Sequence, residues 1–296
     1  LTPLALGSPA RRKDVVMRTF DGKVAAITGA ASGIGRALAV DLSRRGCALA
    51  LSDVDAAGLA QTQALCREGT AEGTALVTSD VVDVANRAEM SAWAESVVGA
   101  HGKANLIFNN AGVALGSTVE AMTWEDMDWL MGINFWGVVH GTKAFLPHLI
   151  RSGEGHVVNV SSVFGLISVP TQSAYNAAKF GVRGFTDALY MELKVARHPV
   201  SATTVHPGGI KTNIVKNARL HESLGAAADL ESTHGRFQSI SMTSPEKAAS
   251  AILTAVRRDR RRVTVGPDAK VIDLLSRLPA PLYQQALVLG ARRELT

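Results

Sequence analysis

Short apolar runs alternate along the chain with longer stretches that are apolar at helical spacing. Residues 23–28 form the first short run, and beyond a glycine-rich turn Ile34, Leu38 and Leu42 recur at the interval of one helix face. Continuous short runs are typical of strands buried on both faces. The alternation predicts an α/β fold, a single-domain, doubly wound, mostly parallel sheet with helices on both faces. Further strands are predicted at residues 47–52, 75–78, 105–108, 156–161, 200–206 and 262–266.

The pattern separates a main domain from two ends. Residues 1–19 show no clear periodicity, so we expect a peripheral N-terminal extension. Residues 20–266 carry the alternating pattern and form the expected domain. Within it, residues 213–243 are irregular, and a loop-rich insert of this length is most often a lid. Residues 267–296 are apolar at helical intervals but contain two prolines, and we expect a C-terminal extension.

Composition and charge narrow the class of protein. The 296 residues are 47% hydrophobic and 19% charged, which suits one large globular domain. No run approaches the roughly 18 apolar residues of a membrane-spanning helix, so we expect no transmembrane segment. The net charge is +5, but the arginine cluster at residues 257–262 has no interleaved aromatic residues, which argues against nucleic-acid binding. Cys47 and Cys66 form no C-x-x-C pair, which indicates a reducing compartment, and we expect a cytoplasmic protein.

The first glycine-rich turn, residues 29–35, predicts a dinucleotide site. Glycines there let backbone N–H groups approach a pyrophosphate at the positive end of the following helix. Asp53 ends the second strand, where its carboxylate can accept hydrogen bonds from the ribose hydroxyls and repel a 2′-phosphate. NAD is therefore favoured over NADP, although Arg36 and the nearby Arg44-Arg45 pair offer cations that a 2′-phosphate could use. Asp53 could also cap the next helix.

Polar residues at later positions extend this site. Asp80 could reach an adenine amino group or, equally, cap the helix that follows. Residues 109–112 suit a wall that packs close to a ligand, with an Asn-rich turn as the alternative. Thr212, in the Pro-Gly segment after a strand, could reach a cofactor phosphate or amide. Asn134 lies on the apolar face of a long helix predicted from Thr123, where its amide must be hydrogen-bonded, and spacing favours a structural bridge over a holder of ordered water.

Tyr175 and Lys179 predict an acid–base pair. We expect a helix from about Ser173, opened by a serine cap, which places both side chains on one face. An ammonium about 5 Å from the phenol oxygen contributes roughly 3 kcal/mol at an effective dielectric of ~20. That lowers the phenol pKa by about 2 units, which makes the tyrosine a usable proton shuttle. An isolated pair of this kind is more often a surface feature, so its weight comes from the rest of the chain.

Four separated motifs agree with one another. They are residues 28–35 (TGAASGIG), residues 109–112 (NNAG), Ser162 thirteen positions before Tyr175, and the Tyr175-x-x-x-Lys179 pair. Together they resemble the short-chain dehydrogenase/reductase family over roughly residues 20–266. The resemblance implies a Rossmann-type fold and hydride transfer between NAD(P) and an alcohol or carbonyl substrate. It also implies a homodimer or homotetramer, formed through the helices that carry Asn134 and Tyr175.

The resemblance assigns roles within the site. It implies that Tyr175 is the acid/base, that Ser162 polarises the reacting oxygen, and that Asn134 supports a proton-relay water. Lys179 is implied to bind the nicotinamide ribose and to lower the tyrosine pKa. The implied cofactor contacts are Gly29, Ser32, Gly33, Ile34, Gly35, Asp53, Asp80, Val81, Asn110, Ala111, Gly112, Tyr175, Lys179, Pro207, Gly208, Ile210 and Thr212.

The substrate and the rival functions are less constrained. Val113, Leu115, Phe164, Leu166 and Val169 are apolar and no arginine clamp accompanies them, which favours a hydrophobic secondary alcohol or ketone, although these residues could equally pack the core. The alternatives are a non-catalytic NAD(H)-binding scaffold or sensor and an NADP(H)-preferring carbonyl reductase. A hydrolase is disfavoured because the chain lacks a G-x-S-x-G motif, and the eight histidines show no metal-ligand spacing, so we expect no metal.

Overall fold

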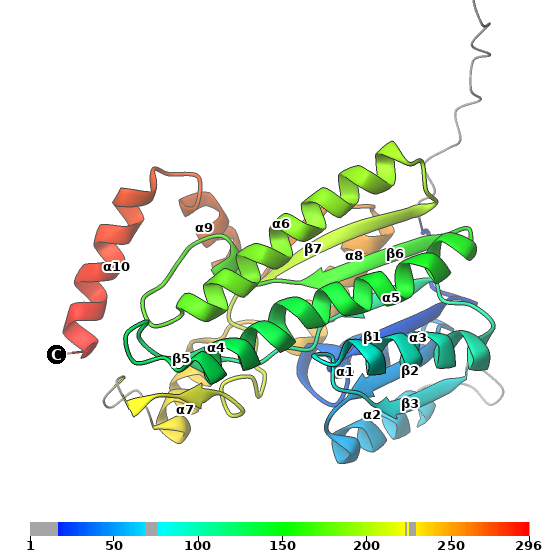
Figure 1. Ribbon diagram of the computed structural model, residues 1–296, viewed down its shortest axis with the longest axis horizontal. Coiled ribbons are helices and arrows are strands. Elements are labelled where there is room, and N and C mark those ends of the chain that lie inside the picture. The colour runs from blue at the N-terminus through cyan, green and yellow to red at the C-terminus, as the bar shows by residue number, and fades with distance from the viewer. Residues whose placement is uncertain (1–16, 69–75, 223, 225–228, 296) are drawn as a thin grey trace, which may run out of the picture.

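The computed structural model describes residues 17–68, 76–222, 224 and 229–295, so most of the expected N-terminal extension lies outside it. In this part of the chain the short apolar runs form one parallel sheet with the order β3-β2-β1-β4-β6-β7-β9 (Figure 1). A separate short pair joins β5 and β8. The strands are β1 (Val24–Thr28), β2 (Ala48–Asp53), β3 (Val77–Val81), β4 (Leu106–Asn109), β5 (Leu115–Gly116), β6 (Gly155–Val160), β7 (Val200–Pro207), β8 (Arg219–Leu220) and β9 (Arg262–Val265).

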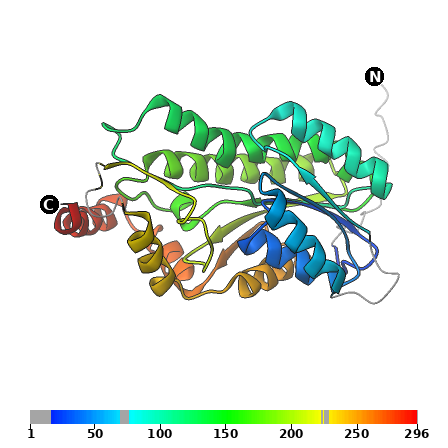
Figure 2. The same ribbon diagram turned by 90° about the horizontal axis from the view of Figure 1, so that it is seen from below.

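Helices cover both faces of the sheet, as Figure 2 shows. Helices α3, α5 and α6 pack on one face, and α1, α2 and α8 pack on the other. The helices are α1 (Gly33–Ser43), α2 (Ala56–Glu68), α3 (Arg87–His101), α4 (Trp124–Met131), α5 (Gly137–Arg151), α6 (Ser173–Val195), α7 (Leu230–Ile240), α8 (Pro245–Arg257), α9 (Pro267–Leu275) and α10 (Ala280–Leu295), with a π-helical turn η1 (Gly132–Trp136) and a 3-10 turn η2 (Val163–Gly165).

The core explains why the strands read as continuous apolar runs. In β1, Ala25 and Ile27 contact the layer of α1 and α8, whereas Val24 and Ala26 contact the layer of α3 and α5. Successive side chains of a strand point to opposite faces, so a strand covered on both sides must be apolar at every position. The doubly wound α/β fold predicted from the pattern is confirmed.

Two local predictions differ from the structure. The helix expected from Thr123 is interrupted by η1, so α4 and α5 are joined through a π-helical turn that contains Asn134. The serine cap predicted for α6 is wrong, because its N-cap residue is Gln172, which forms no side-chain cap bond. The backbone of Gln172 has φ −118° and ψ 24°, which is not the extended conformation that a capping side chain requires.

The segments at both ends of the described chain pack against the main domain. Met17 and Phe20 are each 2% exposed and belong to the core beside α1. At the other end, Ala269 of α9 is fully buried and Arg262 pairs with Asp273 at 2.9 Å. Helix α10 leads away from the sheet at the edge where α9 lies (Figure 1). Residues 213–243, expected to be irregular, contain β8 and α7.

Candidate active site

The candidate site lies at the carboxyl ends of the parallel strands, where β1 is flanked by β2 on one side and β4 on the other. The strand order reverses at this point, and such switch points form ligand crevices in α/β sheets. Gly29 ends β1 with φ +65°, and a Cβ atom there would lie 2.8 Å from Ala111 Cα. A Cβ on Gly35 would overlap the carbonyl oxygen of Gly29. Glycine is therefore required in this turn both for its backbone conformation and for its close packing.

The start of α1 has the features of a phosphate cradle. Gly33 has φ +54°, and its missing side chain leaves space up to Thr212, whose Cγ2 would lie 3.1 Å from an added Cβ. The Ser32 side chain does not cap α1, so it leaves the N–H groups of the first turn open. These groups and the positive helix end fit the pyrophosphate of a dinucleotide. The predicted glycine turn and Thr212 are thus brought together.

Asp53 and Asp80 lie at neighbouring strand ends, and neither caps a helix. Asp53 Oδ2 accepts a hydrogen bond from the Ala31 N–H at 3.0 Å, while α2 has its N-terminal Gly58 N–H bound by Asp55 at 3.0 Å. Asp80 lies within β3, and α3 is capped by Asn86, so the capping alternatives for both aspartates are wrong. Asp53 thus presents a carboxylate to the glycine turn, whereas the charge of Asp80 acts on His101 of α3.

Arg36, the cation that could favour NADP, is engaged within the protein. Its Nε donates to Thr62 Oγ1 at 2.9 Å, and its Nη2 donates to the carbonyl oxygen of Ala31. Nη2 also contacts Gln61 Oε1 at 3.2 Å. These bonds hold the guanidinium against α2 and the glycine turn.

The NNAG segment ties β4 to β1. Thr28 Oγ1 accepts hydrogen bonds from the N–H groups of Asn110 and Ala111, both at 3.0 Å. The Asn110 amide donates in turn to the carbonyl oxygens of Thr28 and Gly29 at 3.0 and 3.1 Å. Asn110 therefore shapes the wall of the cradle through backbone contacts. Gly112 lies beside the next group of residues, because a Cβ there would be 3.2 Å from Asn134 Oδ1 and 3.5 Å from Lys179 Nζ.

Ser162, Tyr175 and Lys179 come together where β6 ends and α6 begins. Lys179 Nζ lies 5.5 Å from the centre of the Tyr175 ring and donates to the Val160 carbonyl oxygen at 3.1 Å. The Ser162 hydroxyl lies close enough to the Tyr175 phenol to favour its ionised form. Lys179 is 3% exposed and Tyr175 is 9% exposed. The spacing prediction that the lysine and tyrosine share one face of a helix is confirmed.

The pKa of Tyr175 departs from the expectation. Burial raises it to about 12, although the Ser162 hydrogen bond opposes this rise. Burial also lowers the pKa of Lys179 to about 8, because an ammonium loses its hydration there. The expected lowering of the phenol pKa is thus wrong for the ligand-free protein. The spacing argument omitted the cost of desolvating the phenolate, which here exceeds the opposing effect of Ser162.

Asn134 is fully buried in η1 and forms two hydrogen bonds to one residue. Its Oδ1 accepts from the Val113 N–H and its Nδ2 donates to the Val113 carbonyl oxygen, both at 2.8 Å. The structural bridge favoured by spacing is therefore present. It anchors the chain just beyond Gly112, within reach of Lys179.

The remaining predicted cofactor contacts differ in whether a side chain or only the backbone is open to a ligand. Val81 is 63% exposed at the end of β3, so its side chain is open to a ligand. Ile34 and Ile210 turn into the core beside α1, and Ile210 is 3% exposed, so they can offer backbone groups only. Pro207 ends β7 and Gly208 follows it, with the Gly208 N–H bound to the Val265 carbonyl oxygen at 3.0 Å.

Two residues near the site were missed from the sequence. His206 is fully buried at the end of β7, and its Nδ1 lies 2.8 Å from the Ser162 carbonyl oxygen. Asp268 Oδ2 accepts the Gly209 N–H at 2.6 Å and so supports the Pro-Gly segment from α9. A histidine before Pro-Gly was visible in the sequence, but its partner was not, because 44 positions separate it from Ser162.

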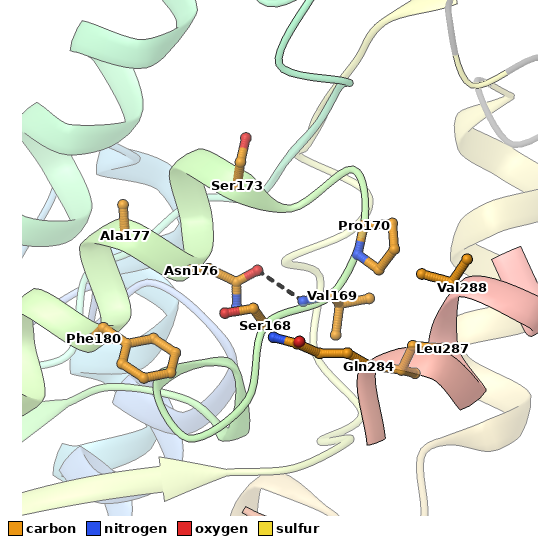
Figure 3. A pocket seen from close by; sticks show the side chains of 10 residues that line it. All are labelled: Ser168, Val169, Pro170, Ser173, Asn176, Ala177, Phe180, Gln284, Leu287 and Val288. Carbon is orange, nitrogen blue, oxygen red and sulfur yellow. Dashed lines mark hydrogen bonds between the residues drawn. The ribbon is translucent and has the colours of Figure 1, made fainter. Parts of the chain in front are cut away.

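A cavity of about 600 Å³ lies outside this cluster, between the 168–170 loop, α6 and α10 (Figure 3). Its α6 residues include Ala177 and Phe180, which are turned away from Tyr175 by the helical period. The Asn176 amide holds the loop by accepting from the Val169 N–H at 3.1 Å, the dashed line in Figure 3. This cavity therefore lies next to the loop and helix that support the candidate site, and not next to its reacting groups.

Among the helices of the described ranges, none has both the length and the apolar character needed to cross a membrane. Within the same part of the chain, no three histidine, cysteine or acidic side chains gather in a way that could hold a metal ion.

The sheet order, the glycine cradle at its switch point and the acidic strand end define a Rossmann-type, dinucleotide-binding protein. The short chain dehydrogenase family model matches residues 23–223. The chain belongs to this family and is an oxidoreductase of the short-chain dehydrogenase type.

Individual relatives agree with this assignment. The SadH protein of Mycobacterium tuberculosis is 49% identical over 279 residues, which are 94% of this chain and 98% of that protein. The 3-ketodihydrosphingosine reductase of Bacteroides thetaiotaomicron is 30% identical, over 88% of this chain and 95% of that one. A short chain dehydrogenase/reductase from Burkholderia phymatum, solved in complex with NAD, superposes with a TM-score of 0.81 at 33% identity, covering 88% of this chain and 94% of that one.

Proposed function

We propose that the protein is an NAD(H)-dependent oxidoreductase that interconverts a hydrophobic secondary alcohol and its ketone. The observation that carries the proposal is the grouping of Ser162, Tyr175 and Lys179 at the end of β6, directly beside Gly112 and the glycine cradle. A bound nicotinamide cofactor would supply or accept the hydride. The protein's own residues then have to bind the substrate oxygen and move one proton.

The proton is assigned to Tyr175 Oη. With its pKa raised to about 12, the ligand-free tyrosine is a neutral phenol and can donate a proton to a carbonyl oxygen. Ser162 Oγ, which lies beside the tyrosine, is assigned to hydrogen-bond the substrate oxygen, whose charge changes during the reaction. Lys179 is assigned to the cofactor ribose and to stabilising the phenolate formed when the proton leaves. Asn134 holds the wall between Gly112 and Lys179 through its Val113 bridge.

NAD is proposed as the preferred cofactor. Asp53, fixed by the Ala31 N–H, places a carboxylate where a 2′-phosphate would be repelled. Arg36 has its guanidinium bound within the protein, which removes the main sequence argument for NADP. The NAD bound to the Burkholderia phymatum relative supports the same preference.

An apolar substrate is proposed from the surfaces around Tyr175. Phe164 packs edge-on against the Tyr175 ring at 6.1 Å, and Leu115 is buried with it. Residues 213–243, the proposed lid, reach the same region, because Leu224 and Leu220 lie against Gly116. The name of the 3-ketodihydrosphingosine reductase relative points to a long-chain ketone as one such substrate.

The assembly and compartment are proposed from the surface and the cysteines. Trp136 is 50% exposed beside α5 and Phe180 is 38% exposed on α6, which supports a homodimer or homotetramer formed through these helices. Cys47 and Cys66 are buried and unpaired, which supports a reducing, cytoplasmic setting.

The decisive experiment is a Tyr175→Phe substitution. We expect kcat for a panel of apolar alcohols and ketones to fall by about 10²–10⁴-fold, because the proton donor is lost, while NAD affinity in calorimetry is retained. Tyr190→Phe is the matched control, since Tyr190 packs against Lys194 on a later turn of α6. Unchanged turnover in the Tyr175 variant would remove the proposed chemistry. NAD binding without turnover of any substrate in the wild type would favour the scaffold alternative.

A further inference from the structure

His206 is a fully buried histidine beside the proposed site, and only one of its ring nitrogens has a partner among the described residues. Nδ1 lies 2.8 Å from the Ser162 carbonyl oxygen. A carbonyl oxygen can only accept, so Nδ1 must carry the proton and Nε2 is left as an unpaired acceptor. A buried polar atom without a partner is uncommon and calls for an explanation.

The end of the β6–β7 ladder explains why His206 Nδ1 is turned to the Ser162 carbonyl oxygen, an arrangement that leaves Nε2 without a partner. The register of the two strands ends at Val160 and Val205, and the last backbone bond runs from the Ser161 N–H to the Val205 carbonyl oxygen at 2.8 Å. Pro207 has no N–H, so β7 cannot continue donating to the segment that carries Ser162. The imidazole of His206 provides the missing donor from the same strand.

Ser162 also accepts two local hydrogen bonds, but these cannot replace the bond from His206. Its carbonyl oxygen also accepts the Gly165 N–H at 2.9 Å, and its Oγ accepts the Phe164 N–H at 3.1 Å. Both donors belong to the η2 turn that Ser162 itself begins, so they shape the turn without fixing it to the sheet. The bond from His206 connects the turn to β7.

We propose that His206 is a positioning residue for the reaction, which holds the Ser162 backbone so that its hydroxyl stays beside the Tyr175 phenol. This inference rests on the proposed function, because it assigns His206 a role only through Ser162 and Tyr175. The histidine remains neutral while it does so, because burial lowers its pKa to about 4. The bond to the Ser162 carbonyl oxygen and the charge of Asp273 oppose this lowering, whereas Arg262 and Arg183 add to it.

The test compares His206→Leu, which removes the donor, with His206→Asn, whose amide can donate from the position of Nδ1. We expect His206→Leu to lower kcat by about tenfold to 100-fold with little change in NAD affinity, because a small displacement of Ser162 is enough to misalign the site. We expect His206→Asn to recover most of this loss.

A pH profile separates positioning from general damage. The Ser162 hydrogen bond lowers the Tyr175 pKa, so weakening it in His206→Leu should move the limb of alcohol oxidation assigned to Tyr175 to higher pH. Lys179, with a pKa of about 8, is the other titrating group that faces the tyrosine, and its Val160 contact does not involve His206. The matched control is His156→Leu, since His156 is also buried but bonds Thr203 at 2.7 Å near the opposite end of the same strand pair.

A second measurement does not depend on turnover. Nitrogen-15 spectra of the histidines, assigned with the His206 variants, should show His206 neutral with its proton on Nδ1 from pH 5 upward. A spectrum that shows the proton on Nε2 would overturn the inference. It would also be overturned if His206→Leu and His156→Leu changed kcat and the pH profile equally. If Tyr175→Phe leaves activity intact, the proposed function itself fails. If Tyr175→Phe abolishes activity but His206→Leu leaves it intact, only the inference about His206 fails.

Discussion

Lys179 is the residue whose burial is most costly within the site. Its pKa of about 8, against 10.5 for an exposed lysine, means that the folded protein disfavours the ammonium. A group with a lowered basic pKa destabilises the fold when protonated, so the native state gains stability as the pH rises from about 8 to 10.5. A difference of this size corresponds to about 3 kcal/mol. The chain retains a destabilising charge beside Tyr175, as expected of a functional group.

We therefore predict that Lys179→Met is inactive but more stable than the wild type at neutral pH. The gain in unfolding free energy should be on the order of 3 kcal/mol, less the loss of the Val160 hydrogen bond. The gain should shrink as the pH rises from about 8 through 10.5, because the wild-type lysine loses its proton first in the folded state and then in the unfolded state. Urea denaturation between pH 7 and 10 measures it. A variant that is less stable at every pH would contradict the prediction.

The proposed preference for NAD over NADP can be tested at Asp53. Replacing it by alanine removes the carboxylate that we propose faces the ribose 2′ position, so kcat/KM with NADP should rise relative to that with NAD by about tenfold or more. Asp55→Ala is the control, because Asp55 binds the Gly58 N–H in the first turn of α2 and leaves Asp53 in place. Initial rates with both cofactors measure the ratio. An unchanged ratio in Asp53→Ala would show that another residue sets the preference.

At the scale of elements, η1 is the feature that periodicity did not predict. A helix with Leu130, Asn134 and Val138 at steps of four looks continuous in sequence, but the chain widens to a π turn at Asn134. Such turns occur often at functional sites. Here the turn brings the amide to the Val113 backbone with two 2.8 Å hydrogen bonds. Local pattern could indicate a buried, bonded amide, but the partner lies on another element.

We predict that Asn134→Ala lowers the free energy of unfolding by about 2–4 kcal/mol, because two partly buried backbone groups of Val113 lose their partners. Asn86→Ala should cost only about 1 kcal/mol, since Asn86 caps the exposed start of α3. Thermal and urea unfolding compare the two variants. Equal costs would mean that the Val113 bridge contributes no more than an ordinary cap.

At the scale of the whole molecule, the C-terminal extension takes part in the site. Asp268, in the first turn of α9, accepts the Gly209 N–H at 2.6 Å, and a Cβ on Gly208 would overlap its carboxylate. The loop after β7 thus has its shape fixed by a residue some 60 positions later. The sequence indicated only a C-terminal extension that is apolar at helical intervals.

We predict that Asp268→Ala weakens NAD binding several-fold, because the loop that carries Gly208 and Thr212 loses its support. Asp268→Asn, which keeps an acceptor oxygen, should bind nearly as well as the wild type. Asp273→Asn is the control on the same helix, where the carboxylate pairs with Arg262 instead. Calorimetric titration with NAD gives the affinities. Wild-type affinity in Asp268→Ala would show that the loop keeps its shape unaided.

The sequence by itself determined the sheet, its two helical layers and the grouping of Gly33, Asp53, Ser162 and Tyr175 at one edge. Buried strands need continuous apolar runs, a glycine turn needs positive φ, and parallel strands bring their carboxyl ends together. Only the tertiary structure decided how each group ionises and what supports it. Desolvation at Tyr175 and the contacts made by His206 and Asp268 depend on residues distant in the chain, which no local pattern encodes.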